Sequence, residues 1–82
     1  MTDSAARRAA KKESARLERK IDTLRTRIEK VEEKLAECVA RIAEDQSALE
    51  EMTDLSAQST QIRQEIDELE EAWLLNAELL YE

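Results

Sequence analysis

The amino-acid sequence predicts an all-α fold, specifically an antiparallel two-helix coiled-coil hairpin. Three observations predict it: the 82 residues include no Gly and no Pro, 40% are charged, and only one Trp and one Tyr are aromatic. Turns that reverse a strand usually recruit Gly, Pro, Asn or Asp, whereas Ala, Leu, Glu, Lys and Arg favour helices. Because bulky aromatic residues are scarce, the buried surface must be a long, thin seam.

The first helix is predicted from apolar residues that recur alternately four and three positions apart. They are Leu17, Ile21, Leu24, Ile28, Val31, Leu35, Cys38 and Ile42. This is the spacing of the a and d positions of a heptad repeat, and it predicts a helix that ends at about residue 44. The lone Cys38 is interpreted as a small apolar seam residue in a reducing compartment, in preference to a redox or metal site.

The second helix, at about 50–80, is predicted from a second series with the same spacing. It comprises Leu55, Ser59, Ile62, Ile66, Leu69, Trp73, Asn76 and Leu80. The two series differ in phase, so either one long helix in a multimer contains a heptad break, or the chain reverses between them. The hairpin is favoured, with a turn at about 45–49, where Ser47 and Glu50 have the spacing of a capping box.

The pairing register describes which residues of the two helices face each other. In an antiparallel pair, the numbers of any two facing residues add up to the same sum, so one sum defines the whole register. A sum of 97 places Leu24 opposite Trp73, Arg25 opposite Glu70 and Glu32 opposite Arg63, whereas a sum of 90 sets Arg25 against Arg63. The expected core anchors are Leu24, Ile28, Leu69 and Trp73. At a sum of 97 the hairpin occupies residues 15–82, and residues 1–14 are a basic helical lead-in or linker beyond it.

Charge is distributed unevenly along the chain. The net charge is −7, with +5 in residues 1–30 and −12 in residues 31–82. A basic end can contact phosphates, and no aromatic residue there can stack on bases, so any nucleic-acid contact is expected to be non-specific. The candidate residues are Arg7, Arg8, Lys11, Lys12, Arg16, Arg19 and Lys20. The alternative is a solvated helix face that neutralises the acidic arm.

Apolar residues continue beyond the seam near the end of the second helix. Leu74, Leu75, Leu79 and Tyr81 make this segment apolar nearly all round. They are expected to pack on Ala9, Ala10 and Ala15, or to dock onto another domain or a second copy of the chain.

Catalysis and membrane insertion are not expected. The chain contains no His, one Cys and no Gly-rich phosphate loop, and adjacent Glu pairs on a two-helix rod are solvated, so no catalytic, cofactor or metal site is predicted. The longest apolar run, Ala72–Leu75, is too short for a membrane span or a secretory signal, which predicts a cytoplasmic protein.

Two segments, Arg7–Glu37 and Leu69–Leu80, resemble the C-terminal domain of ABC-F proteins of the Uup type, cytosolic tandem ATPases without membrane domains. Leu69, Glu70, Glu71 and Trp73 match the Leu-Glu-Glu-x-Trp signature of that family. The tip, DQSALEEM at 45–52, departs from the Asp-Pro and aromatic tip of many members.

The resemblance implies a hairpin accessory domain of a larger chain, with ATP hydrolysis in its ATPase domains. It also implies a contact with DNA or ribosomal RNA, which the residues support only at the basic end. Two other hypotheses remain at this point: a protein-interaction or oligomerisation coiled coil without nucleic-acid binding, and a structural spacer.

Overall fold

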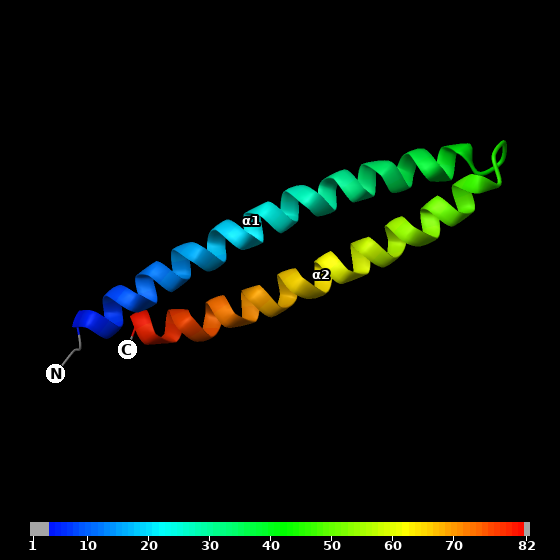
Figure 1. Cartoon of the computed structure of the whole chain (residues 1–82). Coiled ribbons are helices and arrows are strands. Elements are labelled where there is room, and N and C mark those ends of the chain that lie inside the picture. Colours follow the sequence, from blue (N-terminus) through cyan, green and yellow to red (C-terminus); the bar gives the residue numbers. More distant parts are fainter. Residues whose placement is uncertain (1–3, 82) are drawn as a thin grey trace.

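The structure is a computed structural model that describes residues 4–81 as two long helices joined by a short turn (Figure 1). Helix α1 comprises Ser4–Arg41 and helix α2 comprises Ser47–Leu80. The helices run antiparallel side by side, so the two ends of the chain lie together and the turn lies at the opposite end. The molecule measures 67 × 14 × 13 Å. The predicted all-α hairpin is confirmed.

The turn lies about three residues earlier than the sequence indicates. Helix α1 ends at Arg41 instead of about 44, and α2 begins at Ser47 instead of about 50. The backbone N–H groups of Glu44 and Asp45 both donate to the Arg41 carbonyl at 3.0 Å, which closes the last turn of α1. A five-residue connection without Gly therefore reverses the chain.

The predicted capping box at the start of α2 is not formed. Ser47 is already the first helical residue, and its side chain does not cap the helix. Instead, the Asp45 carboxylate accepts hydrogen bonds from the Ser47 backbone N–H (3.0 Å) and hydroxyl (2.7 Å). These two bonds hold the pKa of Asp45 below its usual value. The N-cap position is Gln46, one residue before the Ser47 that the capping box predicted.

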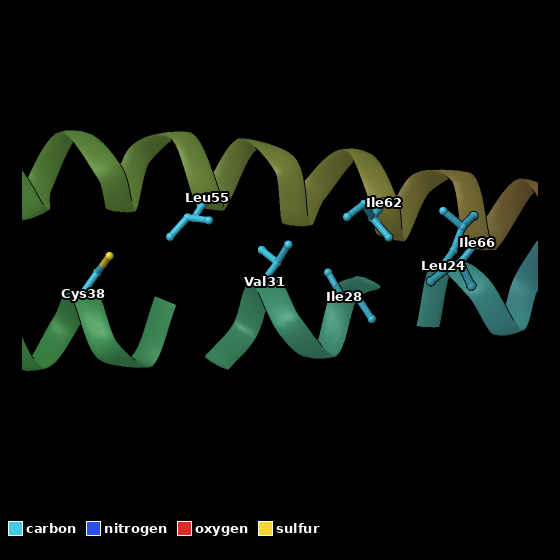
Figure 2. Packing of buried hydrophobic residues seen from close by; sticks show 7 residues of the cluster. All are labelled: Leu24, Ile28, Val31, Cys38, Leu55, Ile62 and Ile66. Carbon is cyan, nitrogen blue, oxygen red and sulfur yellow. The ribbon is translucent and has the colours of Figure 1, made fainter. Parts of the chain in front are cut away.

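The core is a single seam between the two helices. Its buried residues are Leu24, Ile28, Val31, Cys38, Leu55, Ile62 and Ile66 (Figure 2), with Leu35, Met52 and Leu69 partly buried against them. Two small side chains near the turn, Cys38 and Ala48, are completely buried. Of the four expected core anchors, Leu24 and Ile28 are buried, whereas Leu69 and Trp73 are half-buried.

The predicted register is wrong by about one heptad. Figure 2 shows Ile66 across from Leu24, and Leu55 between Cys38 and Val31, whereas a sum of 97 would place Trp73 across from Leu24. The contacts of Trp73 with Glu18 and of Arg41 with Glu51 have residue-number sums of 91 and 92. The facing positions therefore sum to about 90.

The direction in which helical side chains lean explains the error. Side chains lean toward the N-terminus of their own helix. Two long side chains that meet across an antiparallel pair therefore belong to residues whose numbers add up to more than those of facing seam residues. Arg25 does pair with Glu70, at 2.9 Å, and Arg63 with Glu32, as predicted. In both ion pairs the residue numbers add up to 95, and the pairs form although the facing seam residues add up to about 90.

The corrected register extends the paired region toward the start of α1. Ala10 is buried, and its carbonyl accepts a 2.7 Å hydrogen bond from the Asn76 side-chain amide. Residues 10–14 therefore lie beside α2, where an overhang was predicted. Residues 1–3 of the expected lead-in lie outside the described residues, and its separation as a linker stays a prediction.

Cross-linking tests the register. In a Cys38→Ser background, cysteines introduced at positions 24 and 66 should form an intramolecular disulfide on mild oxidation, because these residues face each other across the seam. Cysteines at positions 24 and 73 should not. A disulfide formed with equal yield by both pairs, measured by mass spectrometry after proteolysis, would show that the register slides.

The thin seam makes each buried residue important to stability. Ile62, which is 4% exposed, packs within the core cluster. We expect Ile62→Ala to lower the free energy of unfolding by about 2–5 kcal/mol, because it leaves a cavity that the rod cannot refill. Gln64→Ala, on an exposed position of the same helix, should change it by less than about 0.5 kcal/mol in urea unfolding.

The stability of the hairpin should depend on pH through Asp45, which lies in the turn. Since its folded pKa is lowered, the stabilisation by its charged form is present above its unfolded pKa and is lost as pH falls through the folded value. The thermal midpoint of wild type should exceed that of Asp45→Asn at neutral pH, and the difference should shrink below about pH 4. Glu44→Gln removes the same charge from the turn and leaves the Ser47 bonds intact, so an equal effect of this variant would contradict the assignment.

Candidate functional site

The described residues of the hairpin form open grooves along its surface. Among residues 4–81, no polar or charged side chain is buried, and no group of three or more His, Cys, Asp or Glu side chains is placed to hold a metal ion. Candidate functional residues must therefore act from the outside of the rod.

The seam divides the surface of the hairpin into two sides. Successive helical residues are rotated by about 100°, so Lys20 and Asp22 project to opposite sides of the buried Ile21. An open groove follows the seam on each side near the free ends of the helices. We call them the basic groove and the tryptophan groove, after the residues that distinguish them.

The basic groove has a volume of about 640 Å³ and unlike walls. It is lined by Arg16, Arg19, Lys20, Thr23 and Leu24 from α1 and by Glu65, Glu68 and Leu69 from α2. The structure thus brings together three of the predicted nucleic-acid candidates, and it places two carboxylates across from them. Arg16 also pairs with Glu13 on its own helix, which lowers the pKa of Glu13. A polyanion in this groove would meet repulsion from the α2 wall.

A row of cations continues from this groove along α1. We define the basic rail as Arg16, Lys20, Arg27, Lys30 and Lys34, all of which are exposed. Lys20, Arg27 and Lys34 are seven residues apart and each directly precedes a seam position, so they project to the same side. Within residues 4–81, the last four members of the rail form no ion pair. The rail spans about 27 Å at 1.5 Å per residue.

Three rail residues are not identified by the density of Lys and Arg along the sequence, which is highest at the basic end. Arg27, Lys30 and Lys34 lie outside the densest run of Lys and Arg. Their heptad position was the available signal, since it repeats that of Lys20 and of Arg16. Reading charge by heptad position, in addition to density along the chain, identifies the whole row.

The first turns of α1 hold the remaining candidates. Arg7, Arg8, Lys11 and Lys12 are exposed, and the Arg8 guanidinium donates a 3.4 Å hydrogen bond to the Ser4 carbonyl. At 100° per residue, Arg7 and Lys11 share one side of the helix, while Arg8 and Lys12 share another. The structure therefore does not gather these four cations into one patch.

The tryptophan groove lies on the other side of the seam and is mainly acidic. It has a volume of about 480 Å³ and is lined by Glu18, Ile21, Asp22, Arg25, Glu70, Trp73 and Leu74. The Trp73 indole N–H donates to Glu18 at 3.1 Å, and Arg25 pairs with Glu70. Trp73 therefore forms part of a groove wall and is half-buried, where the sequence predicted a core anchor opposite Leu24.

The apolar end of α2 is not covered by α1. Leu74, Leu75 and Leu79 are each about 60% exposed, and Tyr81 is 88% exposed. Packing of these residues on Ala9, Ala10 and Ala15 does not cover them. Leu74 lines the tryptophan groove, whereas Leu75 and Leu79 lie toward the other side. The exposed apolar surface is therefore divided between two sides.

The charge separation seen along the sequence becomes a separation between helices. Helix α1 holds twelve Lys and Arg against seven acids, a net charge of +5, and α2 holds one Arg against nine acids, a net charge of −8. The two helices lie side by side over nearly their whole length (Figure 1). A ligand thus meets positive or negative charge according to the side it approaches.

These features define a helical hairpin domain with a basic groove on one side of its seam and a mainly acidic groove on the other. Residues 11–77 match the family described as the ABC transporter C-terminal domain. Because the match covers most of the chain, the protein belongs to this family, whose members accompany ABC ATPase domains. No curated protein and no solved structure matches the chain.

Over the described residues 4–81, neither α1 nor α2 contains a stretch with the length and apolarity needed to cross a bilayer.

Proposed function

We propose that this chain is the C-terminal accessory domain of a cytoplasmic ABC protein of the ABC-F type and that it contacts nucleic acid through the basic side of α1. Membership in the ABC transporter C-terminal domain family supports the accessory role. The signature residues Leu69, Glu70, Glu71 and Trp73 favour the ABC-F type. ATP hydrolysis would belong to the ATPase domains of the same parent chain.

The basic rail is the observation that carries the nucleic-acid proposal. Its exposed cations form a row about 27 Å long on one side of α1, and Lys20, Arg27, Lys30 and Lys34 have no ion-pair partner within residues 4–81. Unpaired Lys and Arg bind phosphates by releasing condensed counterions, which does not depend on base sequence. The described rail includes no aromatic residue to stack on bases, so the contact is with the backbone of DNA or ribosomal RNA.

The acidic α2 helix limits how a nucleic acid can approach. Glu65 and Glu68 face Arg16 and Lys20 across the basic groove. A duplex centred on the groove would bring its phosphates close to these carboxylates, whereas one that lies along the outer edge of α1 contacts the rail and avoids them. The geometry therefore favours contact by one edge of the rod, with modest affinity.

A protein-interaction domain without nucleic-acid binding is the second candidate. The observation in its favour is the exposed apolar surface of Leu74, Leu75 and Leu79. Exposed apolar residues clustered at the end of a small rod are typical of docking surfaces. Sedimentation at increasing protein concentration separates self-association from binding to another partner.

Titration of a labelled DNA duplex tests the nucleic-acid proposal. Binding should weaken strongly between about 50 and 200 mM salt, with a slope of about −0.9 per neutralised phosphate. We expect Lys20→Gln with Lys34→Gln to weaken binding and to reduce the magnitude of that slope by about one to two. A ribosomal RNA hairpin in parallel distinguishes the two nucleic acids.

The matched control removes two cations from the opposite side of the seam. Arg25 and Arg63 are paired with Glu70 and Glu32, so Arg25→Gln with Arg63→Gln changes the net charge equally without touching the rail. Equal weakening by both double variants would reject the rail as the contact surface. Absence of binding to both probes at low salt would reject the nucleic-acid proposal. If only the double variant Arg7→Gln with Arg8→Gln weakened binding, the contact would lie at the N-terminal end of α1.

A further inference from the structure

The tryptophan groove combines an apolar floor with a carboxylate rim. Ile21 is buried at its base, Trp73 is half-buried, and Leu74 extends the apolar surface outward with 60% of its area exposed. Tyr81, which directly follows the end of α2, is 88% exposed. The apolar surface therefore continues from the floor of the groove onto the exposed Leu74.

The rim of the groove is negatively charged. Glu18 and Asp22 lie one turn apart on α1, and Glu70 lies across the groove on α2. Arg25 is the cation among the lining residues, and it is already paired with Glu70. The lining residues thus have a net charge of −2, and a ligand that covers the apolar floor must place positive charge against Glu18 and Asp22.

We propose that this groove binds a basic amphipathic helix of a partner protein, which completes a three-helix bundle. The groove follows the seam between two antiparallel helices, and a third helix fills such a groove with apolar residues at positions i, i+3 or i+4, and i+7. Lys or Arg residues beside that stripe would pair with Glu18 and Asp22. The charge of the rim selects this partner over an acidic helix.

The other possible occupants fit less well. Phosphates would be repelled by the rim, so a nucleic acid is directed to the other side of the seam. A second copy of this chain offers one basic helix, α1, and the apolar stripe of α1 is already buried against α2, at Leu17, Ile21, Leu24 and Ile28. A partner helix from another protein, or from another domain, has no such restriction.

The groove and the basic rail lie on opposite sides of the seam and do not depend on each other. Lys20 and Asp22 mark the two sides around Ile21. The helix-binding site therefore goes beyond the proposed nucleic-acid contact, and both surfaces can be occupied at once. A substitution in the tryptophan groove that abolishes helix binding should leave nucleic-acid binding unchanged, and a substitution in the basic rail should have the reverse effect.

Fluorescence of Trp73 tests the proposal directly, because it is the single Trp of the chain. The probe is a synthetic helical peptide of Leu, Lys and Ala with a Leu stripe at heptad spacing, and its twin contains Glu in place of every Lys. The Lys peptide should bind saturably and shift the Trp73 emission to shorter wavelength. The Glu peptide should produce no shift at the same concentrations.

Matched variants assign the binding to this groove. Leu74→Gln and Asp22→Lys should each weaken binding by about tenfold or more, which corresponds to about 1.4 kcal/mol. Leu75→Gln and Glu50→Lys make the same chemical changes at exposed positions away from the groove, and they should change the affinity by less than about twofold. Circular dichroism of each variant verifies that the helices are retained, as expected for substitutions at exposed positions.

Several results would overturn the proposal. Equal binding of the Lys and Glu peptides would show that the rim does not select charge, and equal losses from the groove variants and their controls would place the binding elsewhere. A concentration-dependent dimer that blocks the Lys peptide would assign the groove to a second copy. Failure of both the DNA duplex and the ribosomal RNA hairpin to bind, with normal peptide binding, would reject only the nucleic-acid proposal.

Discussion

The apolar seam between α1 and α2 is the constraint on which the rest of the structure depends. The rod is only 13–14 Å across, so each layer of the seam buries little more than one residue from each helix. Neither helix has another element to pack against among the described residues. Every side chain outside the seam is therefore at the surface, and the heptad position of a residue decides which side of the rod it occupies.

The helices, the seam and their antiparallel arrangement could be predicted because each follows from a local pattern. The alternate spacing of Leu17 to Ile42 requires a helix, and the change of phase before Leu55 requires a reversal or a break. The ion pair of Arg25 with Glu70 was also predictable. These features depend on residue type and spacing, which the sequence contains in full.

The register could not be predicted, because a heptad repeat resembles itself after a shift of seven residues. Sums of 97 and 90 both place apolar residues against apolar residues, and flexible Arg and Glu side chains reach their partners in either case. The turn decides between the two registers. Asp45 binds Ser47 and starts α2 there, so a short connection from Arg41 brings Ala48 into the seam and fixes the shift.

The location of the candidate sites could be predicted only in part, because it depends on the register. The basic residues of α1 were evident, but a register with an overhang made the free helix end look like the contact surface. With Ala10 buried and bonded to Asn76, α1 lies beside α2 from about residue 10 onward. The side of α1 that holds Lys20, Arg27 and Lys34 then becomes the longer exposed row of cations.

Electrostatic screening explains how such a narrow rod can present two surfaces of opposite charge. At physiological ionic strength the screening length is about 8 Å, which is shorter than the 13–14 Å width of the molecule. A phosphate held at the outer edge of Lys20 and Lys34 is therefore largely screened from carboxylates on the opposite side, such as Asp22. The acids that do oppose it are the near ones, Glu65 and Glu68, on the other wall of the same groove. The side of approach, more than the net charge of −7, thus determines which partner the domain attracts.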